Sequence, residues 1–186
     1  MNDDIFFKPR NGDEMSHATD DVPIVKYSTL SEASDILGGG VVGVDRLLRK
    51  MFKKSLKWIV LLQDPKDENS GHWTSLSFNP KKDEVYFFSS YGGKPDFEKN
   101  KWISKEKQKL SHQARDVFND GLKHLCEKGW VIHYNDHPYQ FENDGTATCG
   151  IWTAAFLNSG MNPDQFYRYN LRKHMGVPEY FRKYFC

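Results

Sequence analysis

The sequence predicts a single α+β domain, and three observations favour this class. The chain has 186 residues, a length that fits one domain with a sizeable core. Two helical segments come first and are followed by an unbroken run of three extended segments. A helix, a strand and a helix complete the order. Helices and strands therefore do not alternate regularly, which argues against a repeated βαβ fold.

Two helices are expected before the strands. Residues 1–21 are polar and acidic, so we expect a flexible N-terminal arm there and the domain itself over residues 22–186. Ser28, with Glu32 shortly after it, marks the start of a short helix that the glycines at 38–40 end. Apolar residues at helical spacing predict a second helix over residues 44–54.

The later elements follow from apolar patterning and turn residues. The segments rich in branched and aromatic residues predict strands, and the turn-forming letters NPKKDE between two of them indicate a hairpin. Ser111 and Gly129 bracket a helical stripe, and Gly160 ends an apolar segment that begins at Cys149. We therefore expect strands over 56–63, 72–80 and 84–90, a helix over 111–128, a strand over 130–134 and a helix over 149–159.

Composition excludes several classes of protein. The formal net charge is +1, and the three cysteines are too few and odd in number for a disulfide framework. Their spacing fits no zinc site, no phosphate-binding glycine pattern is present, and no apolar run reaches membrane-spanning length. We expect a soluble protein that works inside a cell or a particle, without a membrane, a metal or a cofactor.

Cys149 stands where a polar loop meets an apolar helix. A helix start favours the thiolate through its unpaired N–H groups and its dipole. Gly150 would let the protein backbone pass close to a substrate, and the Cys149 amide could donate to a developing oxyanion. The alternative is that Cys149 is a small buried hydrophobe, which free cysteine often is.

A nucleophilic cysteine needs a base within hydrogen-bond reach. Among the seven histidines, His72 follows a turn, opens a strand and precedes Trp73. Gln140 lies in the loop that leads to Cys149, where its amide could reach an oxyanion. Each residue alone is weak evidence for a catalytic site. The evidence becomes stronger because the residues occur in this order along the chain.

That order resembles a known family. The segments YSTLSEASDIL, SGHWTSLSF, VYFFSSYGGKPD, WVIHYNDHPYQ and TATCGIWTAAFL are similar to segments of the adenovirus-type maturation proteases. The superfamily also contains proteases that process ubiquitin-like modifiers, and the likeness is greatest to the virophage and large DNA virus enzymes. The resemblance covers roughly residues 22–160. It implies the adenovirus protease type of the papain-like-related fold, a small mixed sheet flanked by helices with the nucleophile on a central helix.

The resemblance also implies roles for single residues. Cys149 matches the nucleophile, His72 the general base, and Gln140 the side chain that completes the oxyanion hole with the Cys149 amide. Trp73 would wall a narrow slot that admits only small side chains before the cut bond. The implied activity is a cysteine endopeptidase that cuts after small residues and matures viral capsid precursor proteins.

The third catalytic position departs from the family pattern. Where the family has Asp, Glu or Asn, this chain has Ser89. Serine can orient the imidazole but brings no charge to stabilise imidazolium. Either Ser89 orients His72, or Asp83, Asp96 or Asn79 takes this role, or activity is weakened.

Partners and location follow from the same resemblance. We expect viral capsid precursor polypeptides as substrates, in the virion or in the cytoplasm of the host cell. An isopeptidase that removes ubiquitin-like modifiers is the first alternative, and a catalytically weak binding module is the second. A basic stretch is expected to be a solvated helix face, with weak nucleic-acid contact as the alternative; it contains Arg46, Arg49, Lys50, Lys53, Lys54 and Lys57.

Overall fold

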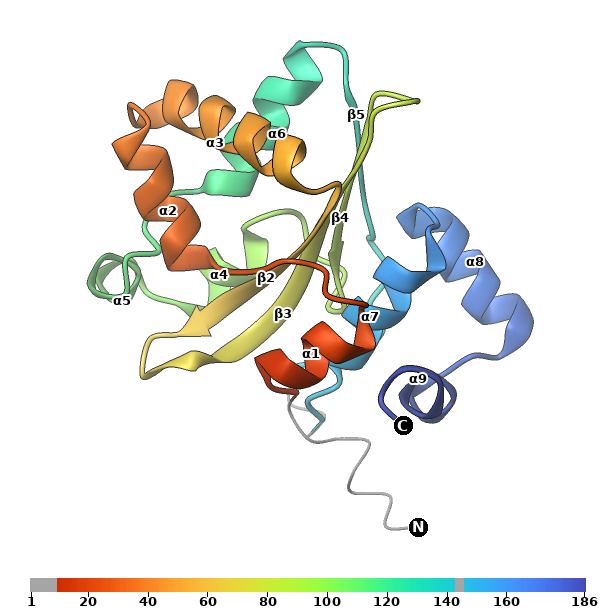
Figure 1. Ribbon diagram of the computed structural model, residues 1–186. Helices are drawn as coiled ribbons and strands as arrows, with labels where there is room; N and C mark the ends of the chain where they lie inside the picture. Colours follow the sequence, from red (N-terminus) through yellow and green to blue (C-terminus); the bar gives the residue numbers. More distant parts are fainter. Residues whose placement is uncertain (1–9, 143–145) are drawn as a thin grey trace.

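The computed structural model describes residues 10–142 and 146–186. Its five-stranded mixed sheet has the order β1-β2-β3-β4-β5 (Figure 1). The three central strands are antiparallel, and an edge strand pairs in parallel at each side. The strands are β1 (Ile24–Lys26), β2 (Lys57–Asp64), β3 (Asp67–Asn79), β4 (Glu84–Ser89) and β5 (Val131–Tyr134). The expected α+β class and the small mixed sheet flanked by helices are confirmed.

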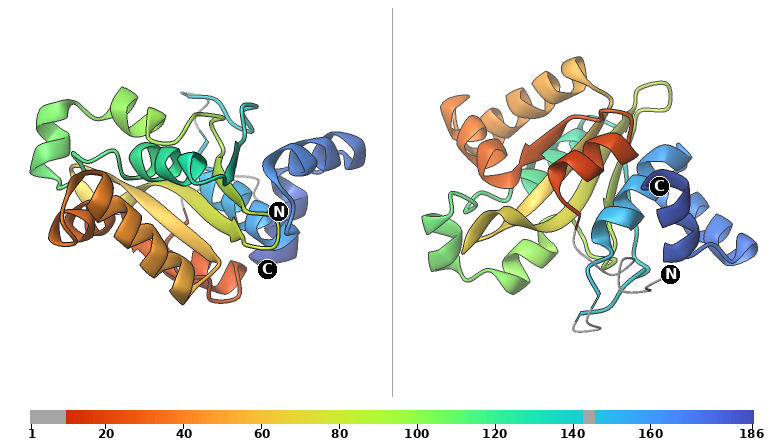
Figure 2. Two further views of the ribbon diagram at one scale, coloured as in Figure 1. Left: turned by 90° about the horizontal axis from the view of Figure 1, so that it is seen from above. Right: turned by 60° about the horizontal axis from the view of Figure 1, so that its bottom comes forward.

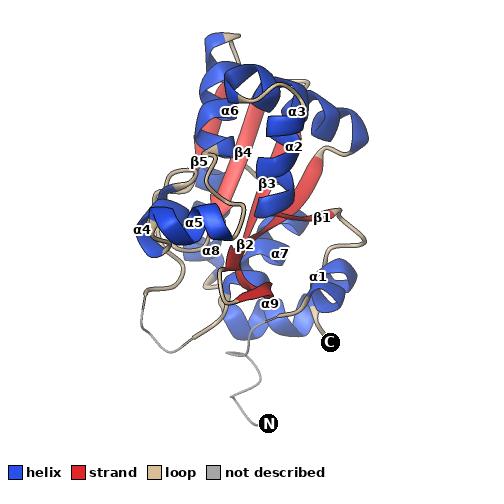
Figure 3. Ribbon diagram, turned by 90° about the vertical axis from the view of Figure 1, so that its left-hand side faces the viewer, coloured by secondary structure: helices blue, strands red, loops and turns tan. Residues whose placement is uncertain are grey.

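One face of the sheet is covered by α2 (Tyr27–Ile36), α3 (Gly40–Lys54) and α6 (Val117–Glu127). Leu76 and Phe87 of the sheet share a core with Val44 and Phe118 of these helices. The short helices α4 (Phe97–Trp102) and α5 (Lys105–Leu110) lie on the same side (Figure 3). Successive strand residues point to opposite faces, so the alternating pattern of β3 separates this core from a second one.

The second face is covered by α7 (Cys149–Ser159), which packs on β3 and β4. Phe156 of α7 stacks on Phe88 of β4 with ring centroids 4.5 Å apart. The helix is apolar on nearly all sides because α1 (Gly12–Ala18), α8 (Pro163–Lys173) and α9 (Val177–Tyr184) surround it (Figure 2). This burial holds the start of α7, and with it Cys149, in a fixed place.

The N-terminal segment corrects one expectation. Residues 1–9 of the expected flexible arm lie outside the described residues, but residues 12–18 form α1 rather than a loose chain. Asn11 and Glu14 form a capping box, and Met15 is fully buried. The capping pattern was present in the sequence, and the polar composition of the segment obscured it.

The expected helix over 111–128 is also corrected. Ser111 does not begin it but ends α5, and α6 starts only at Val117. His112 has a φ of 57°, and the Gln113 side chain bonds both backbone groups of Gln63 on β2. These bonds hold the chain against the sheet, so a helix cannot run through this segment.

The C-terminal segment, from residue 163 onward, folds onto the domain. Phe166 of α8 and Tyr180 and Phe181 of α9 are buried in the core around α7. The basic and aromatic character of this segment therefore reflects amphipathic helices that pack through their rings. Within the described residues, no helix has the length and apolarity that a membrane crossing needs.

Candidate active site

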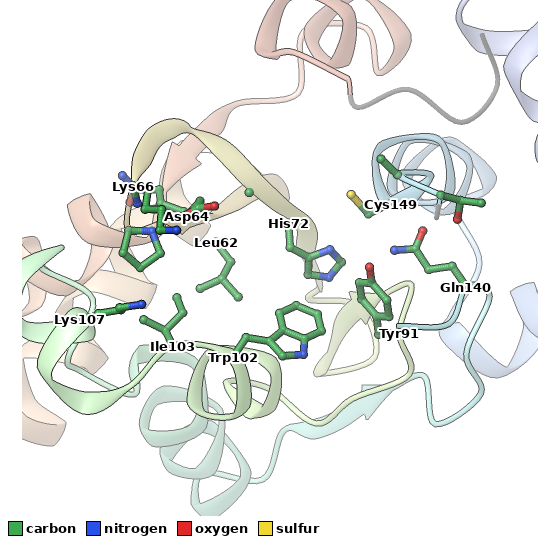
Figure 4. Close-up of a pocket in the computed structure, with 15 residues that line it drawn as sticks. Leu62, Asp64, Lys66, His72, Tyr91, Trp102, Ile103, Lys107, Gln140 and Cys149 are labelled. Atoms are coloured by element: carbon green, nitrogen blue, oxygen red, sulfur yellow. Dashed lines mark hydrogen bonds between the residues drawn. The ribbon is translucent and has the colours of Figure 1, made fainter. Parts of the chain in front are cut away.

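Three of the residues expected in the site meet in one pocket. Cys149, His72 and Gln140 come from α7, β3 and the loop before α7, and all three line a cavity of about 360 Å³. Figure 4 shows them gathered with Tyr91 at one end of the pocket, while Lys66 and Lys107 lie at the other end. The middle of the pocket has apolar walls. Such a pocket can hold an extended chain whose reacting bond lies beside Cys149 and His72.

Strand register brings His72 to Ser89. Thr74 of β3 pairs directly with Ser89 of β4, and His72 lies two residues from Thr74 on the same face. The His72 ring therefore extends diagonally to Ser89, and its Nε2 lies 2.9 Å from the hydroxyl Oγ. This is the contact that the first of the alternatives for the third position expects.

Cys149 begins α7 and is buried. Burial raises the pKa of its thiol, while the N–H groups of Trp73, Gly150 and Cys149 act in the opposite direction by favouring the thiolate. Burial is the larger effect, so the resting group is a thiol. It becomes a nucleophile when a base takes its proton.

His72 lies beside Cys149 in the pocket and can act as that base (Figure 4). Its ring is enclosed by Tyr91 and Trp102, with centroids 4.9 Å and 5.6 Å away. Burial lowers the pKa of His72 to about 3, so the imidazole is neutral at pH 7. Its Nε2 contacts Ser89, while its Nδ1 is buried without a hydrogen-bond partner in the described part of the chain. The structure thus leaves one ring nitrogen available to take a proton.

Gln140 is oriented by the residue before the nucleophile. The Thr148 hydroxyl donates to Gln140 Oε1 at 2.6 Å, so the amide nitrogen is the group left over. That Nε2 is buried and has no partner among the described residues. Since Gln140 lines the pocket, its N–H groups suit an oxygen that acquires negative charge beside Cys149.

If Cys149 attacks a peptide carbonyl, we expect Gln140→Ala to lower kcat by about 10²- to 10³-fold, the usual loss for one oxyanion-hole donor. The substrate's KM should change much less, because the contact strengthens only in the transition state. Steady-state kinetics on a cleavable peptide measure both values. Gln165→Ala, which removes an exposed glutamine on α8, is the control and should keep the wild-type kcat. An unchanged kcat for Gln140→Ala would remove this residue from the mechanism.

Behind His72 and Ser89 stands a carboxyl group that sequence reasoning missed. The Ser89 hydroxyl donates to Glu98 Oε1 at 2.5 Å, and the Glu98 side chain is buried. The alternatives to Ser89 have other contacts. The Asn79 side chain bonds the Tyr86 hydroxyl. The Asp96 carboxyl accepts from the Tyr27 hydroxyl and from the backbone N–H of Asn119. Asp83 lies in the turn between β3 and β4, with its carbonyl bonded to β5.

Trp73 and Gly150 differ from expectation. Neither is among the described residues that line the pocket. Trp73 points to the sheet face opposite to that of His72 and donates its indole N–H to the Arg10 carbonyl at 2.8 Å. A Cβ on Gly150 would come within 2.9 Å of the Arg10 side chain and 3.0 Å of Met15 Sδ. The glycine makes room for the N-terminal segment, and the slot wall expected of Trp73 is not part of this pocket.

The basic stretch is expected to be a solvated helix face, with nucleic-acid contact as the alternative, and some of its cations bond other groups of the chain. Arg46 donates to the Leu37 carbonyl, and Arg49 pairs with Asp45. Lys57 reaches the Leu157 carbonyl on α7 at 2.7 Å. These contacts favour the solvated helix face over nucleic-acid binding. No cluster of three metal-ligating side chains occurs within residues 10–142 and 146–186.

Comparison with known proteins gives a viral context. The chain is 31% identical over 125 residues to the uncharacterized protein V9 of Sputnik virophage. The aligned part makes up 67% of this chain and 60% of the relative, so the chain spans less than two thirds of that protein's length. No family model matches the chain. A similar protein is therefore found in a virophage.

Proposed function

We propose that the chain is a cysteine endopeptidase in which Cys149 is the nucleophile, His72 the base and Gln140 an oxyanion donor. The observation that carries the proposal is their convergence in one pocket. The two side-chain nitrogens that the reaction needs, His72 Nδ1 and Gln140 Nε2, are both buried there without a partner among the described residues. Buried polar groups normally have partners, so their lack of one favours groups kept for a substrate.

The residues support a two-step hydrolysis. His72 Nδ1 takes the thiol proton as Cys149 sulfur attacks the peptide carbonyl carbon, and the carbonyl oxygen becomes an oxyanion. Gln140 Nε2 and the Cys149 N–H donate to that oxygen. The imidazolium gives its proton to the leaving amine, which breaks the C–N bond and leaves a thioester. His72 then takes a proton from water, the hydroxide attacks the thioester, and the acid product leaves with the thiol restored.

The proposed substrates are precursors of viral capsid proteins. The virophage relative supports a viral setting, and the pocket favours an extended polypeptide. A small residue before the cut bond rests on the family resemblance alone, because Trp73 does not line the pocket.

A peptide that ends in a glycine-derived electrophile tests the proposal. We expect one equivalent to label Cys149, as mapped by mass spectrometry, and Cys149→Ser to abolish labelling. Cys126 and Cys186 are exposed thiols that are not among the described residues of the pocket, and they should stay unlabelled. The proposal would be refuted if the peptide labelled all three cysteines equally, or if it did not label Cys149. Cleavage of a virophage capsid precursor, rather than of a ubiquitin-like fusion, would then separate the endopeptidase from an isopeptidase.

A further inference from the structure

We propose that Glu98 is a positioning residue that acts through Ser89 to set the tautomer of His72. The inference rests on the proposed function, in which His72 is the base. It extends that function by a fourth residue, so that Cys149, His72, Ser89 and Glu98 form one connected series. Ser89, at the third position, then transmits to His72 the effect of the Glu98 carboxylate, to which its hydroxyl is bonded.

The geometry of Ser89 carries the argument. Its Oγ lies 2.9 Å from His72 Nε2 and 2.5 Å from Glu98 Oε1, and it accepts the Tyr91 N–H at 3.4 Å. A hydroxyl has one proton and two acceptor sites. The three contacts use the proton and both acceptor sites of Ser89 if the hydroxyl donates to Glu98 and accepts from the His72 ring and from the Tyr91 N–H.

The surroundings of Glu98 fix its state as an acceptor. The backbone N–H groups of Gly93 and Glu98 bond its carboxyl, in addition to the Ser89 hydroxyl. Burial raises the pKa of the carboxyl, while these N–H groups and the Ser89 hydroxyl favour the carboxylate. The Ser89 hydroxyl donates to Oε1, so its proton points towards Glu98.

The single proton of the Ser89 hydroxyl then determines the tautomer of the His72 imidazole. Ser89 cannot donate to Glu98 and to His72 at once, so His72 Nε2 must carry its own proton. In a neutral ring this leaves the lone pair on Nδ1, the nitrogen that has no partner among the described residues. The same carboxylate favours the imidazolium when Nδ1 takes the thiol proton, since a negative charge lies one hydroxyl away.

The backbone holds this series in place. Asn135 bonds both backbone groups of Ser89, accepting from its N–H at 3.0 Å and donating to its carbonyl at 2.6 Å. A Cβ on Gly93 would lie 2.6 Å from Glu98 Oε1, so only glycine leaves space for the carboxylate to approach. The turn between β4 and α4 is therefore built to bring Glu98 against Ser89.

The test is the tautomer of His72 in the full chain, read from ¹⁵N chemical shifts of histidine-labelled protein. The His72 resonances are assigned by their loss in His72→Ala. In the wild type we expect a neutral ring with the proton on Nε2. In Glu98→Gln the amide can no longer accept from all three donors, so Ser89 becomes free to donate to Nε2. We expect the population to shift towards the Nδ1–H form, and kcat to fall by about 10- to 100-fold, as for outer-shell partners at metal sites.

Two further variants make the test specific. In the Ser89→Ala background, Glu98→Gln should change neither the tautomer nor kcat further, because Glu98 acts through the hydroxyl. Glu142→Gln, which removes an exposed carboxylate near Glu98, should leave the tautomer as in the wild type. If Glu98→Gln does not fold, Ser89→Ala is the second variant and should abolish the preference for Nε2–H.

A wild-type ring with the proton on Nδ1, or a tautomer unchanged by Glu98→Gln, would overturn the inference. Additive losses in the double variant would do the same. The tautomer measurements do not depend on peptide cleavage. A tautomer shift without Cys149 labelling would refute the protease and keep the role of Glu98, while labelling without a tautomer shift would do the reverse.

Discussion

His72→Ala should lower kcat by roughly 10⁴- to 10⁶-fold, the loss seen when the base of a nucleophile–base pair is removed. The Cys149 thiol has a raised pKa, so it needs a base to lose its proton at neutral pH. No other described group takes the place of His72. Asp64, a carboxylate on the pocket wall, lies towards the far end (Figure 4).

Single-turnover and steady-state kinetics with one peptide measure this loss, and a thermal melt checks the fold. His133→Ala is the matched control. His133 is a partly buried histidine of β5 that pairs with Glu84 and is not among the described residues of the pocket. Its removal should leave kcat within a few-fold of the wild type. A His72→Ala protein that retains a tenth of the activity would show that His72 is not the base.

The helix that carries the nucleophile was predictable because its signals are local. Turn-forming residues precede Cys149, an apolar run follows, and Gly160 closes it with a φ of 65°. The structure places α7 at the predicted bounds. The β3–β4 hairpin was predictable for the same reason, since its alternation and its turn lie within one short stretch.

The short helices were not predictable. α4 and α5 have six residues each and are rich in lysine, so they show no apolar stripe long enough to detect. They are held by tertiary contacts instead. Buried Lys99 of α4 donates to the Gln113 carbonyl and pairs with Asp116 at 2.6 Å. Such contacts join residues far apart in sequence and leave no periodic pattern.

The site divides in the same way. Cys149 could be singled out from its place at a helix start, whereas His72, Ser89 and Gln140 were singled out through their order along the chain and the family resemblance. Glu98 could not, because its contact with Ser89 depends on how the turn at Gly92 and Gly93 returns the chain. The glycine pair was the only local signal, and it does not identify a carboxylate five or six positions on.

The second large effect concerns the pH dependence of Cys149. Between pH 6 and 8 we expect its alkylation by iodoacetamide to rise by about tenfold per pH unit, because only the thiolate reacts. A raised pKa keeps the thiolate fraction small at pH 7, and each unit of pH multiplies that fraction by about ten until the pKa is reached. With the pKa of His72 at about 3, no imidazolium is present in this range to stabilise the thiolate.

Peptide mapping separates the three thiols in one experiment. At pH 7 we expect exposed Cys126 to react faster than buried Cys149, although the helix start alone predicts the reverse order. Burial decides the order for a small reagent, whereas the base and the oxyanion donor decide it for the peptide electrophile. The two reagents should therefore select different cysteines.

His72→Ala gives the matched comparison. If the resting pair is neutral, removing the imidazole takes away no charge, and the alkylation profile of Cys149 should keep its slope between pH 6 and 8. If the pair is a thiolate and an imidazolium, the wild type should already show a plateau at pH 5 to 6, and His72→Ala should convert it into a rising profile. A wild-type plateau would contradict the neutral pair. It would mean that the Glu98 carboxylate, acting through Ser89, holds the proton on His72 before any substrate arrives.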